Sequence, residues 1–244
     1  MLERGVHVLQ AFRPQGGTLS LTALVRRTGL PKATAYRLAE LLVELRLLER
    51  APRGYAPGIA LFELGELVPI KRRLREAALP FMQDLFEATH ETVHLGVRDD
   101  LDVVYAEKIR GHVAVTAPSR VGGRLPLSST AVGKALLAFA DPAVVDAVLS
   151  RPLRRLTEHS ISDPVVLADQ LAQIRASGLA YDHEEAALGV SCVASPVLVH
   201  GQPVAALSLS VPATHVQPAR LAPAVRTVSL ALSRLLSQSG TAGG

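Results

Sequence analysis

The sequence contains a single cysteine, Cys192, and no long apolar run. One cysteine excludes a disulfide within the chain and is compatible with a reducing compartment. No stretch approaches the roughly 18 consecutive apolar residues of a membrane-spanning helix. Charged residues interrupt the N-terminal segment MLERGVHVLQAF, so it lacks the apolar block of a signal peptide. These absences predict a soluble, cytoplasmic protein with no membrane partner.

Charge is distributed unevenly along the 244 residues, a length that allows two ordinary domains. Residues 1–76 contain 13 Lys+Arg and 7 Asp+Glu, a balance of +6, whereas the remaining residues contain 13 and 15, a balance of −2. A small basic segment joined to a larger, mildly acidic one is typical of a module that binds a polyanion. Chance variation in surface charge explains the difference equally well at this point.

Three helices joined by short turns are expected near the N-terminus. Apolar spacing predicts a helix over residues 2–12. Ser20 is a suitable N-cap for a short second helix that Gly29 ends, and Pro31 suits the first turn of a third helix. The segment LLERAPRGYAPG then predicts a two-stranded ribbon. This order is that of a winged helix-turn-helix domain, expected over residues 1–57.

The third helix offers a surface for DNA. Its leucine stripe faces inward, so the polar side chains project to the other side. The N-terminal end of such a recognition helix meets base edges and phosphates in the major groove, and the wing tip reaches an adjacent backbone or minor groove. The candidate DNA-binding residues are Lys32, Thr34, Tyr36, Arg37, Arg53 and Tyr55. A three-helix unit with an ordinary solvated face is the alternative.

The rest of the chain is expected to form an α+β domain. A helical pattern interrupted by Pro69 predicts a linker helix over residues 58–77, and another helix is expected to begin at Pro80. Valine-rich segments with a period of two then predict strands. These segments are TVHLGV, DVVYAEKI, VAVTAP, LAYDHE, SCVASPVLV and VAALSLSV. Three helices are expected between the segments VAVTAP and LAYDHE, near residues 130–140, 142–150 and 164–177. An amphipathic helix closes the domain, residues 78–238, before a tail, residues 239–244, that is expected to be disordered.

The segment HETVH, residues 90–94, fits the H-E-x-x-H pattern of zinc peptidases, so a zinc-dependent hydrolase is an alternative function. Zinc binding requires both histidines on one helix face, one turn apart. Thr92 and Val93 are β-branched, and the alternation that follows them favours a strand beginning near Thr92. Four residues of a strand span about 13 Å, which is too far for two ligands of one zinc ion. We therefore expect no metal site and no enzymatic activity.

The segments LERGVHVLQAF, GLPKATAYRLAELL and GVSCVASPV resemble those of IclR-type bacterial transcriptional regulators. The stretch GLAYDHEEAALGVSCVASPV resembles that family's effector-domain signature and departs from it at Leu198 and Val199. The resemblance implies a winged helix-turn-helix, a linker helix and a GAF-like domain, an antiparallel sheet flanked by helices, that binds a small molecule without any cofactor. It also implies a homodimer, or a dimer of dimers, on a palindromic double-stranded DNA operator, acting as a repressor or an activator.

Several residues suit an effector pocket. STAVGKA around Lys134 departs from a phosphate loop at Ser128 and Ala135, but the free N–H groups at the start of its helix could hold a carboxylate. A plain N-cap explains that turn equally well. Ser208 and Ser210 share one strand face, and packing explains Cys192 better than nucleophilic catalysis does. Partly by resemblance, the candidate effector-binding residues are His94, Ser129, Thr130, Ala131, Val132, Asp182, Val190, Cys192, Ser208 and Ser210. The expected function is sequence-specific DNA binding controlled by a small, carboxylate-bearing metabolite.

Overall fold

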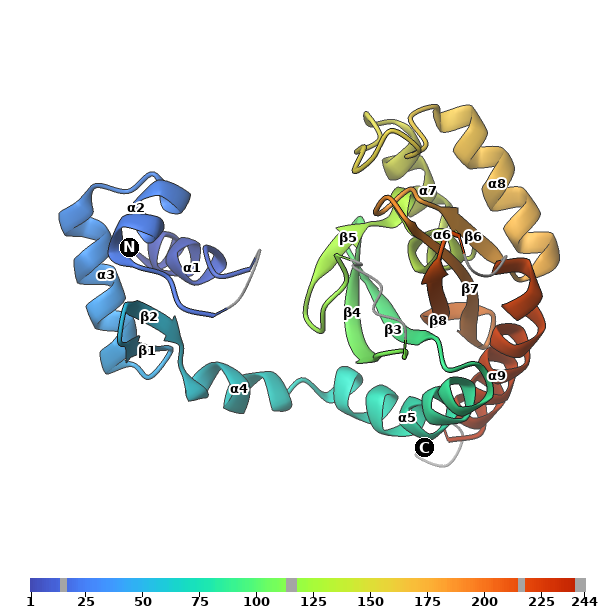
Figure 1. The fold of residues 1–244 in the computed structure, drawn as a ribbon, viewed down its shortest axis with the longest axis horizontal. Coiled ribbons are helices and arrows are strands. Elements are labelled where there is room, and N and C mark those ends of the chain that lie inside the picture. The colour runs from blue at the N-terminus through green and yellow to red at the C-terminus, as the bar shows by residue number, and fades with distance from the viewer. Residues whose placement is uncertain (14–16, 113–117, 215–217, 240–244) are drawn as a thin grey trace. The chain divides into compact units, whose positions relative to one another are not determined.

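The structure, a computed structural model, describes residues 1–13, 17–112, 118–214 and 218–239. It divides into two compact units, Met1–Arg72 and Arg73–Gly244, and each is described by itself (Figure 1). The expected strand VAVTAP and the expected disordered tail fall almost entirely outside the described residues.

The N-terminal unit is a winged helix-turn-helix. Its elements are α1 (Leu2–Gln10), α2 (Leu21–Thr28), α3 (Lys32–Glu44), β1 (Leu48–Ala51), β2 (Gly54–Pro57) and α4 (Ile59–Glu66). Ser20 caps α2 by accepting a hydrogen bond from the N–H of Ala23 at 3.2 Å, and Gly29 ends α2 with a left-handed φ of 67°. Leu24, Leu38 and their apolar neighbours form the core of this unit. The three predicted helices and the ribbon are confirmed.

The second unit is built on one six-stranded antiparallel sheet in the order β5-β4-β3-β8-β7-β6. Its elements are α5 (Pro69–Thr89, which begins just before the division), β3 (Thr92–Asp99), β4 (Asp102–Ile109), β5 (Arg124–Pro126), the 3-10 turn η1 (Leu127–Ser129), α6 (Ala131–Ala138), α7 (Pro142–Leu149), α8 (Pro164–Ser177), β6 (Ala180–His183), β7 (Val190–Val199), β8 (Gln202–Pro212) and α9 (Pro218–Ser239).

Helices cover both faces of this sheet (Figure 1). On one face, α5 and α9 pack against alternate strand residues such as Leu95 and Leu207. On the other face, α6, α7 and α8 form a second apolar core that includes Leu136 and Leu171. The predicted α+β class, with an antiparallel sheet flanked by helices, is confirmed.

The expectation that a helix begins at Pro80 is wrong. The helix α5 starts at Pro69 and continues through Pro80. Pro69 occupies the first turn, where a missing N–H costs nothing because that group has no partner in the helix. Pro80 removes one hydrogen bond inside the helix, but the buried side chains of Ala78 and Met82 on either side hold this part of α5 against the sheet. The segment expected as a linker therefore consists of α4 and the first part of α5.

Gly96 in β3 allows α6 to lie directly on the sheet. A Cβ atom at this position would lie 2.5 Å from Cγ1 of Val132 in α6 and 2.8 Å from Cγ1 of Val103 in β4. Both distances are shorter than van der Waals contact. The first turn of α6 therefore reaches the sheet because residue 96 has no side chain.

We expect Gly96→Ala to lower the free energy of unfolding by about 1–3 kcal/mol, the usual cost of overpacking a core. Denaturant unfolding measures this change. Gly5→Ala is the control, because it adds the same methyl group inside α1 where no atom beyond the adjacent backbone of the helix lies within 4 Å, and it should be neutral or slightly stabilising. Adding Val132→Ala to Gly96→Ala should restore part of the loss. Unchanged stability in Gly96→Ala would contradict the close approach.

Candidate functional site

The predicted DNA-binding side chains mostly lie on the surface of the N-terminal unit. Those that are at least partly exposed are Lys32, Thr34, Tyr36, Arg37 and Arg53. Arg53 lies in the turn between β1 and β2, at the tip of the wing. Sequence reasoning did not single out Arg4 of α1, which lines the same surface groove as Thr34 and Arg37. This surface combines cations and hydrogen-bonding groups at the N-terminal end of α3, as contact with DNA requires.

The expected position of Tyr55 at the wing tip is wrong. Its side chain is buried in the core, and its hydroxyl donates a hydrogen bond to Oε1 of Glu40 in α3 at 2.6 Å. The other carboxylate oxygen of Glu40 pairs with Arg50 of β1. Burial, followed by the neighbouring carboxylate, raises the pKa of Tyr55 to about 12. Tyr55 thus joins the wing to α3 and is not available to DNA.

The segment HETVH enters a strand, as its residue pattern predicted. β3 begins at Thr92, so His90 is an exposed residue between α5 and β3, whereas His94 is buried inside the sheet. Within the described part of the chain, no three His, Cys, Asp or Glu side chains are grouped as the ligands of a metal ion would be. The geometry therefore gives the zinc-hydrolase alternative no support.

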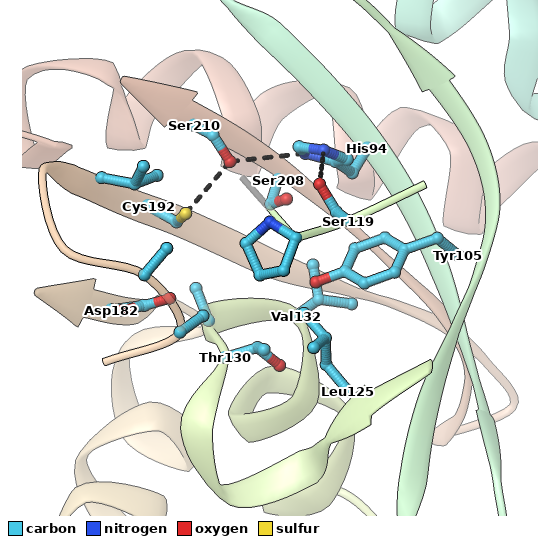
Figure 2. Close-up of a pocket in the computed structure, with 15 residues that line it drawn as sticks. His94, Tyr105, Ser119, Leu125, Thr130, Val132, Asp182, Cys192, Ser208 and Ser210 are labelled. Carbon is cyan, nitrogen blue, oxygen red and sulfur yellow. Dashed lines mark hydrogen bonds between the residues drawn. The ribbon is translucent and has the colours of Figure 1, made fainter. Parts of the chain in front are cut away.

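Strand register brings a set of polar side chains together in the C-terminal unit (Figure 2). Asp182 lies opposite Cys192 in the pairing of β6 with β7, and Cys192 lies opposite Ser210 in the pairing of β7 with β8. His94 of β3 lies opposite Ser208 of β8. Directly opposed residues of antiparallel strands share a face of the sheet. These five side chains consequently line a cavity under the first turn of α6.

The first turn of α6 supplies the other wall of this cavity. Thr130 caps the helix by accepting a hydrogen bond from the N–H of Gly133 at 2.9 Å. Ala131 and Val132 line the cavity, and their N–H groups have no partner within the helix because they belong to its first turn. Ser129 does not line it: the Ser129 hydroxyl donates to the carbonyl oxygen of Arg154 at 2.9 Å.

Nine of the ten candidate effector-binding residues therefore meet at one cavity, with Ser129 the exception. The lining residues that sequence reasoning missed are Tyr105, Pro118, Ser119, Leu125, Ala186 and Ala187. Tyr105 lies opposite Gly96, so only knowledge of the strand register could have placed it. The cavity has a volume of about 20 Å³, little more than the space of one water molecule.

A chain of hydrogen bonds crosses one wall of the cavity, and Figure 2 shows it from Ser119 to Cys192. Nζ of Lys108 donates to the carbonyl oxygen of Ser119 at 2.9 Å and to its hydroxyl at 3.3 Å. The Ser119 hydroxyl lies 2.7 Å from Nε2 of His94, Nδ1 of His94 lies 3.4 Å from Oγ of Ser210, and this Oγ lies 3.0 Å from Sγ of Cys192.

Lys108 fixes the direction of the first bond of this chain. A lysine ammonium can only donate, so the Ser119 hydroxyl accepts from Lys108, and its own proton is available to Nε2 of His94. Burial, followed by the charge on Lys108, lowers the pKa of His94 to about 3. The imidazole is therefore neutral. When the Ser119 hydroxyl donates to Nε2, the imidazole proton lies on Nδ1 and is donated to Ser210.

One hydroxyl in the cavity is left over. Ser208 is 2% exposed and lines the cavity, but its hydroxyl has no hydrogen-bond partner among the residues that the structure describes. Ser119, Thr130 and Ser210 all use theirs. Ser208 is thus a group that a bound molecule would satisfy.

Two carboxylates and one ammonium are buried beside the cavity. Lys134 of α6 donates to Oε1 of Glu185 at 2.6 Å and to Oε1 of Gln170 at 2.9 Å. Asp182, which is 1% exposed, accepts a hydrogen bond on Oδ1 from the N–H of Glu185 at 2.7 Å. Burial first, and the negative charge of Glu185 second, raise the pKa of Asp182 to about 7. The sequence pattern around Lys134 gave no sign of this ion pair.

Family comparisons agree with both parts of the structure. Residues 1–52 match the model of the IclR helix-turn-helix domain, and residues 70–234 match that of the bacterial transcriptional regulator IclR C-terminal domain. The chain belongs to the IclR family of bacterial transcriptional regulators. It is 36% identical over 242 residues to the HTH-type transcriptional regulator XynR of Escherichia coli, covering 96% of both chains. It is 31% identical over 221 residues to the acetate operon repressor of Salmonella typhimurium, covering 88% of this chain and 81% of that one.

Solved structures show the same architecture. An IclR homologue from Microbacterium hydrocarbonoxydans in complex with 4-hydroxybenzoate superposes with a TM-score of 0.86 at 30% identity, covering 96% of this chain and 97% of that one. The IclR of Thermotoga maritima gives a TM-score of 0.76 at 30% identity, covering 97% and 98%. As a member of the IclR family, this protein is a DNA-binding transcriptional regulator with a C-terminal ligand-binding domain, and not an enzyme. None of the described helices has the length and apolar character needed to cross a membrane.

The buried, neutral His94 predicts a pH dependence of stability. Below about pH 6.5 the unfolded chain protonates this imidazole, whereas the folded protein does not, so stability falls as the pH falls from 6.5 toward 3. Between pH 7 and pH 5 the wild type should lose about 2 kcal/mol more of its free energy of unfolding than His94→Gln does. Denaturant titrations at both pH values measure the difference. His159→Gln, at an exposed position, should behave as the wild type. The same pH dependence in His94→Gln and the wild type would contradict the assignment.

Proposed function

We propose that this protein is a cytoplasmic repressor or activator of transcription that binds a palindromic operator as a homodimer or a dimer of dimers. A small, carboxylate-bearing metabolite binds in the C-terminal cavity and changes the affinity of the protein for that operator. One observation carries the effector part of the proposal. The cavity presents the Ser208 hydroxyl and the N–H groups of Ala131 and Val132, and none of these groups has a hydrogen-bond partner among the residues that the structure describes.

The surface of α3 supports sequence-specific DNA binding. Arg37 and Lys32 are exposed on the recognition helix, and Arg53 is exposed at the wing tip. An arginine in the major groove can donate two hydrogen bonds to one guanine, and wing cations neutralise phosphates. The concentration of positive charge in residues 1–76 strengthens the attraction to DNA.

The surface of α4 supports self-association. None of its residues is buried within the chain, and its large apolar side chains Ile59, Phe62 and Leu64 are more than half exposed, as is Leu67 immediately after it. Such a cluster is costly in water and is typical of an interface. A second copy related by a two-fold axis would cover it, and that symmetry matches a palindromic operator.

The lining of the cavity supports a carboxylate ligand. A carboxylate can accept hydrogen bonds from the first-turn N–H groups of α6, where the helix dipole also favours negative charge. The Ser208 hydroxyl can donate a further bond. The relative solved with 4-hydroxybenzoate binds a molecule that carries a carboxylate, which is consistent with an acid in this cavity.

The small volume of the cavity supports a link between ligand binding and conformation. A space of about 20 Å³ is too small for an organic acid, so the binding of one requires the lining groups to move apart. A ligand that prefers the opened conformation shifts the population toward it. Operator affinity changes to the extent that the two conformations bind DNA differently.

We expect Arg37→Ala to weaken operator binding by about 10- to 100-fold, equivalent to about 1–3 kcal/mol for one base-reading arginine. Genomic pull-down identifies an operator, and fluorescence anisotropy at fixed salt measures the affinity. Arg151→Ala removes the same charge from an exposed position in the C-terminal unit and should leave the affinity unchanged. Full affinity in Arg37→Ala would remove it from the DNA contact, and a wild type without sequence preference at moderate salt would reject the DNA proposal.

We expect Ser208→Ala to weaken the binding of a small acid about fivefold, because one hydrogen bond contributes about 1 kcal/mol. A thermal-shift titration with a panel that includes 4-hydroxybenzoate and acetate measures this change. Ser195→Ala is the matched control, since Ser195 is a buried serine of β7 opposite Leu207, on the sheet face away from the cavity. Equal ligand-induced shifts in wild type and Ser208→Ala would exclude Ser208 from the binding site.

A further inference from the structure

The cavity has an unfavourable charge for an acid. Asp182 is its one carboxyl group, and its described lining residues include no lysine or arginine. The nearest buried cation, Lys134, already donates to Glu185 at 2.6 Å. With Asp182, Glu185 and Lys134 all ionised, this buried cluster has a net charge of −1. A carboxylate ligand would bring a second negative charge into a site with little water, where repulsion between like charges is strong.

We propose that the cavity takes its carboxylate ligand together with one proton, which Asp182 holds while the ligand is bound. The proposal rests on the proposed function, because it assumes an acidic effector. The proton comes from the solvent and forms an O–H bond on the Asp182 carboxyl, and no bond of the ligand is broken. The cluster is then neutral before the ligand enters, and Asp182 becomes a hydrogen-bond donor instead of a repelling charge.

Backbone contacts hold the Asp182 carboxyl group in place. Oδ1 accepts a hydrogen bond from the N–H of Glu185 at 2.7 Å, and the N–H of Ala186 also bonds to this carboxyl group. Glu185 is itself fixed in place, since its carbonyl oxygen accepts from the Ser160 hydroxyl at 2.7 Å and its side chain accepts from Lys134. These contacts fix the position of the Asp182 carboxyl group at the cavity.

Other titratable groups surround Asp182. They are Glu185 and Lys134, which pair with each other, together with Cys192 of β7, Tyr105 of β4 and His94 of β3. Burial raises the pKa of both Cys192 and Tyr105, so they stay protonated, and the pKa of His94 near 3 keeps it neutral. The pKa of Asp182, about 7, lies inside the physiological range. Between pH 6 and pH 8, Asp182 is therefore the cavity group whose charge changes.

Calorimetry of the full-length protein tests the proposal, with 4-hydroxybenzoate as the probe. Titrations at pH 6 and pH 8, each in buffers of different ionisation enthalpy, give both the affinity and the number of protons taken up. If only the protonated form binds, wild-type affinity falls roughly tenfold between pH 6 and pH 8, and nearly one proton is taken up per ligand at pH 8. Asp182→Asn should take up no proton and should keep at pH 8 the affinity that it has at pH 6.

Two controls isolate Asp182. Asp169→Asn makes the same change at an exposed position in α8 and should keep the wild-type pH dependence. The neutral analogue 4-hydroxybenzamide should bind without the tenfold change, because it brings no charge. Proton uptake is measured on the wild type, so its absence would overturn the inference even if Asp182→Asn does not fold.

The outcomes separate this inference from the proposed function. Binding of 4-hydroxybenzoate by the wild type without proton uptake at pH 8 would overturn the inference and leave the acidic effector standing. Weaker binding by Asp182→Asn at both pH values would also overturn it, since Asp182 would then act as an ionised acceptor. No binding of 4-hydroxybenzoate or acetate at either pH would reject the acidic effector, and the inference with it.

Discussion

Antiparallel register is the constraint on which the C-terminal unit depends. The apolar residues of β3 and β8 that face α5 and α9 fix how these strands align. The same alignment sets His94 opposite Ser208, and the pairing of β7 with β8 sets Cys192 opposite Ser210. A slip of one residue would turn every one of these side chains to the other face. The core on one face of the sheet therefore holds the cavity on the other.

The buried ion pair of Lys134 and Glu185 positions the surrounding segments more than it stabilises the fold. Desolvation of two charges cancels much of their attraction, so such pairs add little net stability. Glu185 nevertheless contacts three different segments, through Lys134 of α6, Asp182 of β6 and Ser160 of the loop before α8. Glu185 therefore joins these three segments beside the cavity.

Local signals predicted the parts of the fold that local forces determine. Ser20 and Gly29 mark the ends of α2, and the β-branched residues after His90 mark the start of β3. The helix α5 continues through Pro80 because it packs against the sheet, and this packing cannot be predicted from the position of the proline. The burial of Tyr55 depended on Glu40, 15 residues earlier in the chain.

The lining of the candidate cavity also combines features that nearby residues determine with features that distant residues determine. The resemblance to a family and the start of a helix at Ala131 indicated most of its lining, because strand alternation and helix capping are local properties. The direction of the Ser129 side chain depended on a carbonyl group 25 residues away, and the place of Tyr105 depended on the partner strand. The pairing of Lys134 with Glu185 crosses 51 residues, beyond the reach of any sequence spacing.

The contact of Glu40 with Tyr55 and Arg50 has a consequence for how operators diverge within a family of this kind. It ties the middle of α3 to the wing, so the spacing between α3 and the wing tip is fixed. If α3 reads bases and the wing contacts the DNA backbone, as proposed, exposed side chains before Glu40, such as Lys32 and Arg37, can vary without altering that spacing. The distance along DNA between the base contacts and the flanking wing contact should therefore be preserved in related operators even where their sequences differ.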